Sequence, residues 1–171
     1  MKILDRRLLA SSLTCVLLAL PFTAPAADAI TRRSLPDFPI ASSVAVPGAA
    51  RIVFVSGTLA DVARPDAPAG STERLGDTET QTASVLARIE KELAASGLTM
   101  ADVVKMNVFM VGDPAKGGTM DFAGLMKAWG RYFGEPSQGK LPTRTTVQVA
   151  ALPIPGALVE IEAIAARKPS R

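Results

Sequence analysis

Apolar and polar residues alternate along the chain with two periods, one typical of strands and one typical of helices. Runs rich in β-branched residues and bounded by proline or glycine predict strands. These runs are residues 43–46, 51–57 and 102–111 and the two ends of 141–166. Residues 30–39 predict a short edge strand or extended arm, because Pro36 and Pro39 limit its pairing. Pro47-Gly48 separates the first two runs, and this spacing predicts a hairpin ending at Ser56-Gly57.

Two further stretches have helical periodicity. The first begins at Asp77 or Thr78, either of which can cap a helix, and Gly97 is a good stop because glycine accepts the left-handed conformation. Its apolar stripe consists of Val85, Leu86, Ile89 and Leu93. The second runs from Phe122 to Phe133, and its stripe consists of Leu125, Met126, Trp129 and Phe133. Both stripes are expected to pack against a sheet.

The predicted order of elements is β-β-α-β-α-β-β, with loops at residues 60–76 and 113–121. Two helices on one face of a mostly antiparallel sheet are a common α+β arrangement. The sequence therefore predicts a single α+β domain of this kind. It contains no internal repeat, P-loop or dinucleotide-binding fingerprint.

The last predicted hairpin, residues 141–166, has an unusual polar set. Because side chains alternate across a strand, Arg144, Thr146 and Gln148 share one face of the first strand. Glu160 and Glu162 share one face of the second strand. A tight hairpin that keeps polar beside polar places Gln148 near Glu160, with Arg144 roughly 13 Å further along at ~3.3 Å per residue. Arg144 and Glu160 would then need a second subunit or a strong twist to act together.

This polar set has two chemical interpretations. Arg144 can grip a substrate carboxylate with two parallel hydrogen bonds, while a glutamate holds a water or moves a proton. The alternative is an ordinary lattice of polar or ionic cross-strand pairs, which strand alternation alone favours.

The first residues have the features of a secretory signal peptide. Lys2, Arg6 and Arg7 precede an apolar run at residues 8–20, and Ala24-Pro25-Ala26 offers a cleavage site. We predict a signal peptide at residues 1–26, a single domain at 27–171, and a periplasmic or secreted protein. An uncleaved anchor fits less well, because the run is shorter than the roughly 20 residues of a spanning helix. After cleavage no membrane association is expected.

Composition narrows the possible chemistry. The chain has no histidine, and its one cysteine, Cys15, lies in the predicted signal peptide. Cysteine nucleophiles, histidine bases and ordinary zinc sites are therefore excluded from the mature domain. The net charge of +3 falls close to neutral without residues 1–26, and no lysine or arginine cluster suggests nucleic acid.

Several segments resemble the RidA/YjgF family. Residues 142–153, PTRTTVQVAALP, followed by 156–165, GALVEIEAIA, resemble its C-terminal motif. Residues 53–57, VFVSG, resemble one of its strands, and the stretch from Gly97 to Phe109 resembles its passage from helix to strand. The resemblance covers about residues 43–167.

This resemblance implies a chorismate-mutase-like α+β fold, a homotrimer and ligand clefts between subunits. It also implies hydrolysis of reactive enamines or imines, such as 2-aminoacrylate or 2-imino acids, to 2-oxo acids and ammonia, without a cofactor or metal. In this scheme Arg144 binds the substrate carboxylate, Glu160 directs the catalytic water, and the backbone of Gly57 lines the pocket.

Three positions depart from the family pattern. Ser42 stands where active members usually have tyrosine, Met126 stands where they often have asparagine, and Thr146 replaces a frequent cysteine. The family resemblance still assigns all three to the substrate pocket. The alternative function is a non-catalytic trimer that binds small acids or acts like a chaperone.

Overall fold

The computed structural model describes residues 29–134 and 140–168. The predicted signal peptide, residues 1–26, lies outside the described residues, so export stays a prediction. Among the helices within the described ranges, none is both long enough and apolar enough to cross a membrane.

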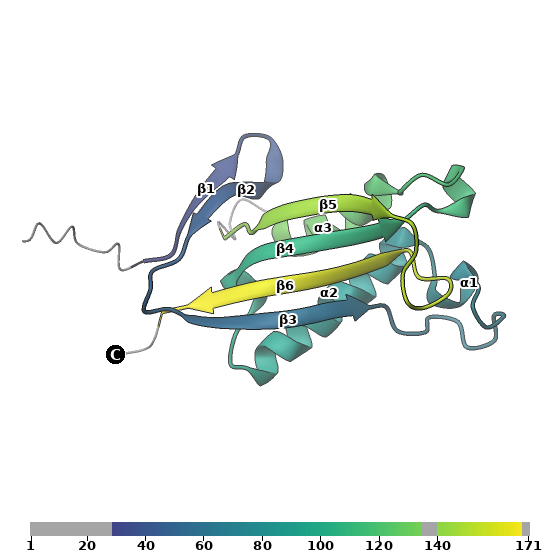
Figure 1. Ribbon diagram of the computed structural model, residues 1–171, viewed down its shortest axis with the longest axis horizontal. Coiled ribbons are helices and arrows are strands. Elements are labelled where there is room, and N and C mark those ends of the chain that lie inside the picture. The colour runs from purple at the N-terminus through teal and green to yellow at the C-terminus, as the bar shows by residue number, and fades with distance from the viewer. Residues whose placement is uncertain (1–28, 135–139, 169–171) are drawn as a thin grey trace, which may run out of the picture.

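The elements follow the predicted α+β order with small additions (Figure 1). The strands are β1 (Thr31–Leu35), β2 (Phe38–Ala45), β3 (Arg51–Leu59), β4 (Val103–Val111), β5 (Thr143–Val149) and β6 (Val159–Arg167). The helices are α1 (Thr72–Leu75), α2 (Thr78–Ala95) and α3 (Phe122–Phe133), with short 3-10 turns η1 (Met100–Asp102) and η2 (Pro114–Lys116). The two segments predicted as loops therefore contain α1 and η2 respectively.

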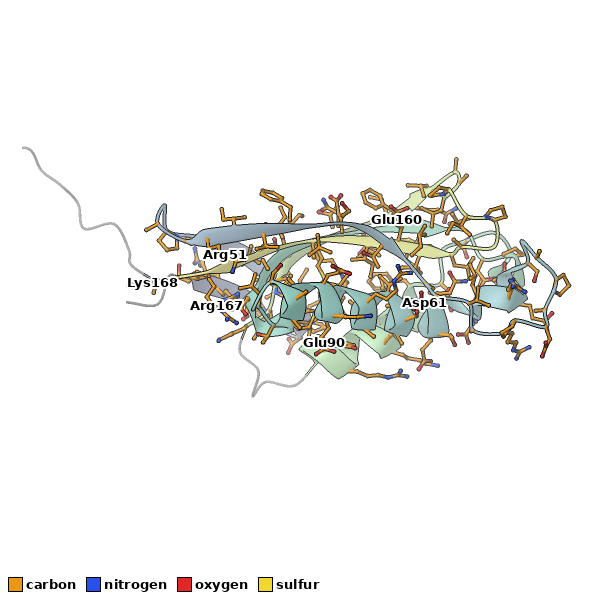
Figure 2. The ribbon with its side chains drawn as sticks, turned by 90° about the horizontal axis from the view of Figure 1, so that it is seen from below. Arg51, Asp61, Glu90, Glu160, Arg167 and Lys168 are labelled. Atoms are coloured by element: carbon orange, nitrogen blue, oxygen red, sulfur yellow. The ribbon has the colours of Figure 1, made fainter. Side chains whose placement is uncertain are left out.

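The central sheet has four strands in the order β3-β6-β4-β5. The ladders of β6 with β3 and with β4 are antiparallel, and β4 pairs with β5 in parallel. Helices α2 and α3 cover one face, and the opposite face is open within the described chain (Figures 1 and 2). The expected class, two helices on one face of a mostly antiparallel sheet, is confirmed.

The helices form where the pattern of caps and apolar residues predicts them. The Asp77 carboxylate accepts a hydrogen bond from the Thr80 N–H at 2.8 Å and starts α2. Gly97, with a φ of +70°, follows its last turn. The predicted stripe residues are buried except Met126, which is partly buried. Each fully buried aliphatic side chain stabilises the fold by roughly 1.5–3 kcal/mol.

The predicted hairpin between the last two strands is wrong. Strand β4 lies between β5 and β6, with Met110 opposite Gln148 on one side and Phe109 opposite Glu160 on the other. Alternate β4 side chains, Met106 and Val108 among them, are fully buried beneath the helices. A strand this apolar is stabilised by a neighbour on each side, and the connection after β5 is long enough to pass across it.

The predicted hairpin between the runs at 43–46 and 51–57 is also wrong. Strand β2 pairs with β1 in a separate ribbon, and β3 pairs with β6. Contacts at the other edge of the main sheet hold the ribbon instead. The Ala41 N–H donates to the Pro142 carbonyl at 2.8 Å, and the Trp129 indole N–H donates to the Pro39 carbonyl at 2.9 Å.

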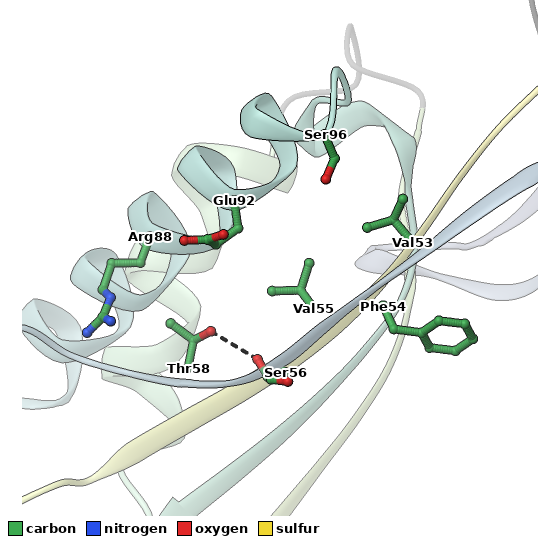
Figure 3. A pocket seen from close by; sticks show the side chains of 8 residues that line it. All are labelled: Val53, Phe54, Val55, Ser56, Thr58, Arg88, Glu92 and Ser96. Atoms are coloured by element: carbon green, nitrogen blue, oxygen red, sulfur yellow. Dashed lines mark hydrogen bonds between the residues drawn. The ribbon is translucent and has the colours of Figure 1, made fainter.

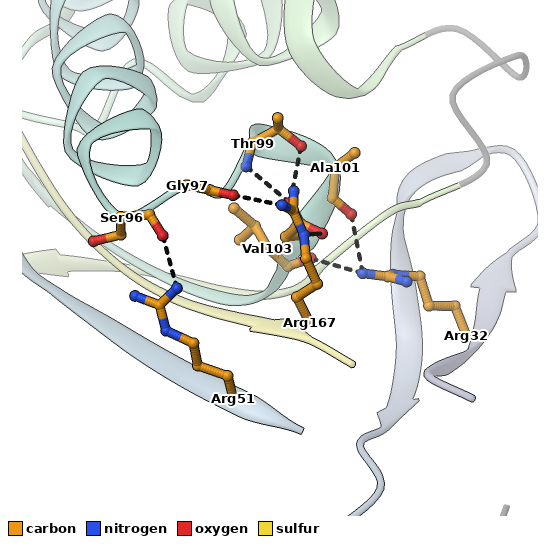
Figure 4. Close-up of polar contacts among 9 residues, drawn as sticks. Arg32, Arg51, Ser96, Gly97, Thr99, Ala101, Val103 and Arg167 are labelled. Carbon is orange, nitrogen blue, oxygen red and sulfur yellow. Dashed lines mark hydrogen bonds and ion pairs between the residues drawn. The ribbon is translucent and has the colours of Figure 1, made fainter. Parts of the chain in front are cut away.

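Three arginines tie the strands to the turn between α2 and β4 (Figure 4). Arg51 donates to the Ser96 carbonyl at 2.8 Å, and Arg167 donates to the Gly97 carbonyl and the Asp102 carboxylate. Arg32 reaches the Ala101 and Val103 carbonyls at 3.3 and 3.2 Å. The contacts of Arg51 and Arg167 satisfy carbonyls at the end of α2, and those of Arg32 satisfy carbonyls of η1 and β4, so this arginine group has a structural role.

Candidate functional site

Arg144 lies on the helix-covered face of β5, opposite the buried Met106 of β4. Three aromatic rings surround its guanidinium. Their centroids lie 5.5 Å (Phe38), 5.4 Å (Phe122) and 4.4 Å (Trp129) from its central carbon. The rings come from β2 and α3, so the enclosure depends on the ribbon packing against the far edge of the sheet.

The charge of Arg144 is only weakly compensated. Within the described residues no carboxylate forms an ion pair with it, and its hydrogen bond goes to the Met126 sulfur at 3.3 Å. Burial lowers the pKa of Arg144 to about 10. A guanidinium has five N–H donors, so most of them are left for a ligand. This arrangement suits an anion that accepts two hydrogen bonds.

Of the other predicted site residues, Thr146 and Met126 lie on the same side of the sheet as Arg144, whereas Ser42 does not face it. Thr146 follows Arg144 on the same face of β5, and its hydroxyl is buried without a hydrogen-bond partner in the described chain. Met126 of α3 contacts Arg144 directly through its sulfur. Ser42 lies on β2, but its side chain is exposed and its hydroxyl donates to the Arg33 carbonyl across the ribbon at 3.0 Å.

Glu160 lies on the open face of the sheet (Figure 2), and its side chain is beside Gly57. A Cβ added at Gly57 would lie 1.9 Å from Glu160 Oε1, so the carboxylate occupies the space that a side chain would need. The β3–β6 ladder is irregular between Val55 and Thr58, which places Gly57 in a β-bulge. That Gly57 lines the site with its backbone stays a prediction.

Arg144 and Glu160 do not share a site within one chain. They lie on opposite faces of the sheet, because Arg144 is in register with Met106 and Glu160 with Phe109. Their strands are separated by β4, a lateral distance of about 10 Å. The expectation of a single polar face is therefore wrong, because it assumed that the two strands pair directly.

Glu162 lies on the open face beside Glu160 and already has a partner. The Asn107 amide donates to its carboxylate at 2.6 Å across the β4–β6 ladder. This is the ordinary cross-strand pair that strand alternation favoured. Of the two carboxylates, Glu160 is therefore the one better able to interact with a ligand.

The aromatic enclosure of Arg144 was not predicted as part of a site. Trp129 was assigned to the core stripe of its helix, and Phe38 fell in the segment treated as an arm. Phe122 and Trp129 are seven residues apart, a spacing that places them on one helix face, which was the available signal. Phe38 had no local signal, because its place depends on a contact between distant segments.

A groove of about 350 Å³ lies elsewhere, between β3 and α2 (Figure 3). Its lining includes Val53, Val55 and Glu92 but none of the predicted site residues. Arg88 at its rim donates to the Leu59 carbonyl and pairs with Asp61, both at 2.9 Å. The groove therefore lies at the edge of the sheet and is separate from the predicted site. Within the described residues, no group of metal-binding side chains is arranged so that it could hold a metal ion.

The protein is thus a small α+β protein with an enclosed arginine, Arg144, on one face of its sheet and a carboxylate, Glu160, on the other. These two groups and their surroundings are called the two half-sites. The family described as Endoribonuclease L-PSP matches residues 38–167. The chain belongs to this family, which is the RidA/YjgF family.

Individual relatives agree with this assignment. Protein DfrA of Myxococcus xanthus is 38% identical over 117 residues, which cover 68% of this chain and 77% of DfrA. Reactive Intermediate Deaminase A, chloroplastic, of Arabidopsis thaliana is 38% identical over 114 residues, covering 67% of this chain and 52% of that protein. The crystal structure of E. coli TdcF with bound serine is similar with a TM-score of 0.52 and 33% identity, covering 68% of this chain and 80% of that chain.

Proposed function

We propose that the protein hydrolyses reactive 2-imino acids or their enamine tautomers to 2-oxo acids and ammonia. The observation that carries the proposal is the Arg144 guanidinium, which is partly buried and has no carboxylate partner in the described chain. It lies in the segment that matches the family, and an Arabidopsis relative is named a reactive intermediate deaminase.

The reaction needs few protein groups. A carboxylate on the substrate is held by the Arg144 guanidinium, which fixes the position of the imine carbon. Glu160 accepts a proton from water as the oxygen adds to that carbon, and a proton returns to nitrogen before the C–N bond breaks. Water therefore supplies the oxygen of the 2-oxo acid, and the nitrogen leaves as ammonia.

The proposal includes a homotrimer with clefts between subunits. Because Arg144 and Glu160 lie on opposite faces of one sheet, a complete site needs Glu160 from a neighbouring copy. Apolar side chains on the open face support an association, since Phe54, Ile52 and Val147 are 75%, 48% and 41% exposed. The trimer is tested by measuring the mass of the purified protein in solution; a monomer at all concentrations contradicts it.

A trapping assay tests the activity. An amino-acid oxidase generates 2-iminopropanoate from alanine, and semicarbazide traps the imine at a rate that is easily followed. The protein is expected to lower the rate of trapping, and Arg144→Met is expected to lose this effect. If the wild type does not compete with the trap while a relative with the usual tyrosine and asparagine does, the enzymatic function is refuted.

Two observations favour a second candidate, a trimer that binds small acids without turnover. Met126 offers Arg144 a weak sulfur acceptor where an amide is frequent, and the Ser42 hydroxyl is engaged in the β1–β2 ribbon. Calorimetry with pyruvate separates the two functions. Binding that Arg144→Met abolishes, without turnover in the wild type, supports the binding protein.

A further inference from the structure

Gln81 is a buried polar residue that the proposed reaction does not use. It lies near the start of α2, and its exposed fraction is 0%. A primary amide offers two N–H donors and one carbonyl acceptor, and burying it is costly unless these groups find partners. All of these groups are engaged here.

The Gln81 amide joins two segments that are far apart in the sequence. Its nitrogen donates to the Gly76 carbonyl at 2.8 Å and to the Gly156 carbonyl at 3.1 Å. Its oxygen accepts from the Leu158 N–H at 2.7 Å. One side chain therefore holds the segment before α2 and the segment that enters β6.

These two segments continue the strands that hold Glu160 against Gly57. Strand β3 carries Gly57 and leads into the segment that ends at Gly76. Leu158 directly precedes β6 and is two residues before Glu160. The Leu158 carbonyl also accepts from the Val111 N–H at 2.9 Å, so this peptide is fixed between Gln81 and β4.

The contact between the two segments leaves little free space. A Cβ at Gly156 would lie 2.4 Å from the Ser71 carbonyl, and its φ of +83° suits glycine. The Glu160 carboxylate likewise fills the space beside Gly57, since a Cβ added there would lie 1.9 Å from Oε1. We therefore expect a shift at the entry of β6 to displace the Glu160 carboxylate relative to β3.

We propose that Gln81 is a positioning residue for Glu160, which it fixes through the backbone at Gly156 and Leu158. The inference rests on the proposed function, because Glu160 is the group that is positioned. A misplacement of about 1 Å can cost up to roughly 100-fold in rate, so the alignment at this point has a measurable effect.

Gln81→Met tests the proposal, since it keeps the volume and removes all three hydrogen bonds. We expect kcat in the imine-trapping assay to fall roughly 10- to 100-fold. KM is expected to stay within about twofold, because Arg144 and its aromatic enclosure lie on the other face. Thr82→Val is the matched control. Thr82 is equally buried, but its hydroxyl donates only within α2, to the Thr78 carbonyl at 2.7 Å.

A readout other than activity separates this proposal from the proposed function. The carbon-13 resonance of the Glu160 carboxylate, assigned with Glu160→Gln, is expected to move in Gln81→Met and not in Thr82→Val. If the wild type is inactive, the deaminase function fails and this resonance still decides whether Gln81 positions Glu160. An unmoved resonance, or an equal fall of kcat in both variants, overturns the proposal. Gln81→Glu, which keeps the acceptor for Leu158, replaces Gln81→Met if the latter does not fold.

Discussion

The two faces of the sheet hold their functional groups by different physical means. On the helix-covered face, three rings from β2 and α3 enclose Arg144, and burial lowers its pKa to about 10. On the open face, Glu160 lies where Gly57 has no side chain. The first half-site depends on packing between distant segments, and the second depends on a local irregularity of one strand.

This difference separates binding from chemistry. In the proposed reaction the Arg144 guanidinium binds the substrate carboxylate without help from Glu160, while the Glu160 carboxylate directs water only where a substrate is bound. Substitutions on the covered face should therefore change affinity, and those on the open face should change turnover.

Arg144→Met should have the largest effect, a fall of pyruvate affinity by roughly 10- to 100-fold, because hydrogen bonds from a charged donor contribute about 1.5–3 kcal/mol. The free energy of unfolding should change little. Three cation–π contacts of roughly 0.5–2 kcal/mol each offset the cost of burying the cation, and both are lost together.

Calorimetry and thermal unfolding measure the two effects separately. Arg64→Met is the control, since Arg64 is exposed and pairs with Glu73 at 2.9 Å. A large loss of stability in Arg144→Met, with affinity unchanged, would assign Arg144 to the core and remove it from the site.

Gly57→Ala should act on the opposite half. The added methyl lies 1.9 Å from Glu160 Oε1, so the carboxylate must move, and we expect kcat to fall roughly 10- to 100-fold with pyruvate affinity unchanged. Overpacking should also cost about 1–3 kcal/mol of stability. Gly48→Ala is the control, because an added Cβ there meets nothing within 4 Å. A weakened pyruvate affinity with normal kcat would show that the two half-sites are not separable.

The sequence predicted the helices and the site positions better than it predicted which strands are neighbours. The α2 and α3 stripes, the caps and the Arg144 and Glu160 positions follow from local patterns of three to seven residues. The partners of β2 and β5 do not, because alternation defines the faces of a strand but not its neighbours. Pairing β5 directly with β6 placed Arg144 and Glu160 on one face, and the intervening β4 reverses that result. The Phe38 contact and the Gln81 amide depend on pairings of the same long-range kind.

Met126→Asn should have a smaller effect, in the direction of a gain. The thioether is a weak acceptor for the Arg144 N–H, and an amide oxygen at the same position is a stronger one that also orders a bound carboxylate through its N–H groups. We expect affinity for pyruvate to rise by up to about tenfold, corresponding to one net hydrogen bond of about 1 kcal/mol. Met120→Asn, at a partly buried methionine outside the Arg144 enclosure, is the control. A loss of affinity would mean that the sulfur and the rings already provide the better fit.

The smallest predicted effect is the response of the covered half-site to alkaline pH. Burial lowers the folded-state pKa of Arg144 from the ordinary value of an arginine to about 10, so the cation is lost from the native protein as pH rises through that value. Stability should not fall on this account. Above about pH 10 the arginine of the unfolded chain, which keeps its higher ordinary pKa, binds the proton more strongly, so stability rises with pH. Pyruvate affinity should fall about twofold at pH 10 relative to pH 8, because half of the sites are then neutral. Calorimetry at both values, with circular dichroism to verify folding, measures the change. An affinity that is constant to pH 10.5 would show that solvent reaches the guanidinium freely, and the contrast between an enclosed half and an open half would then be lost.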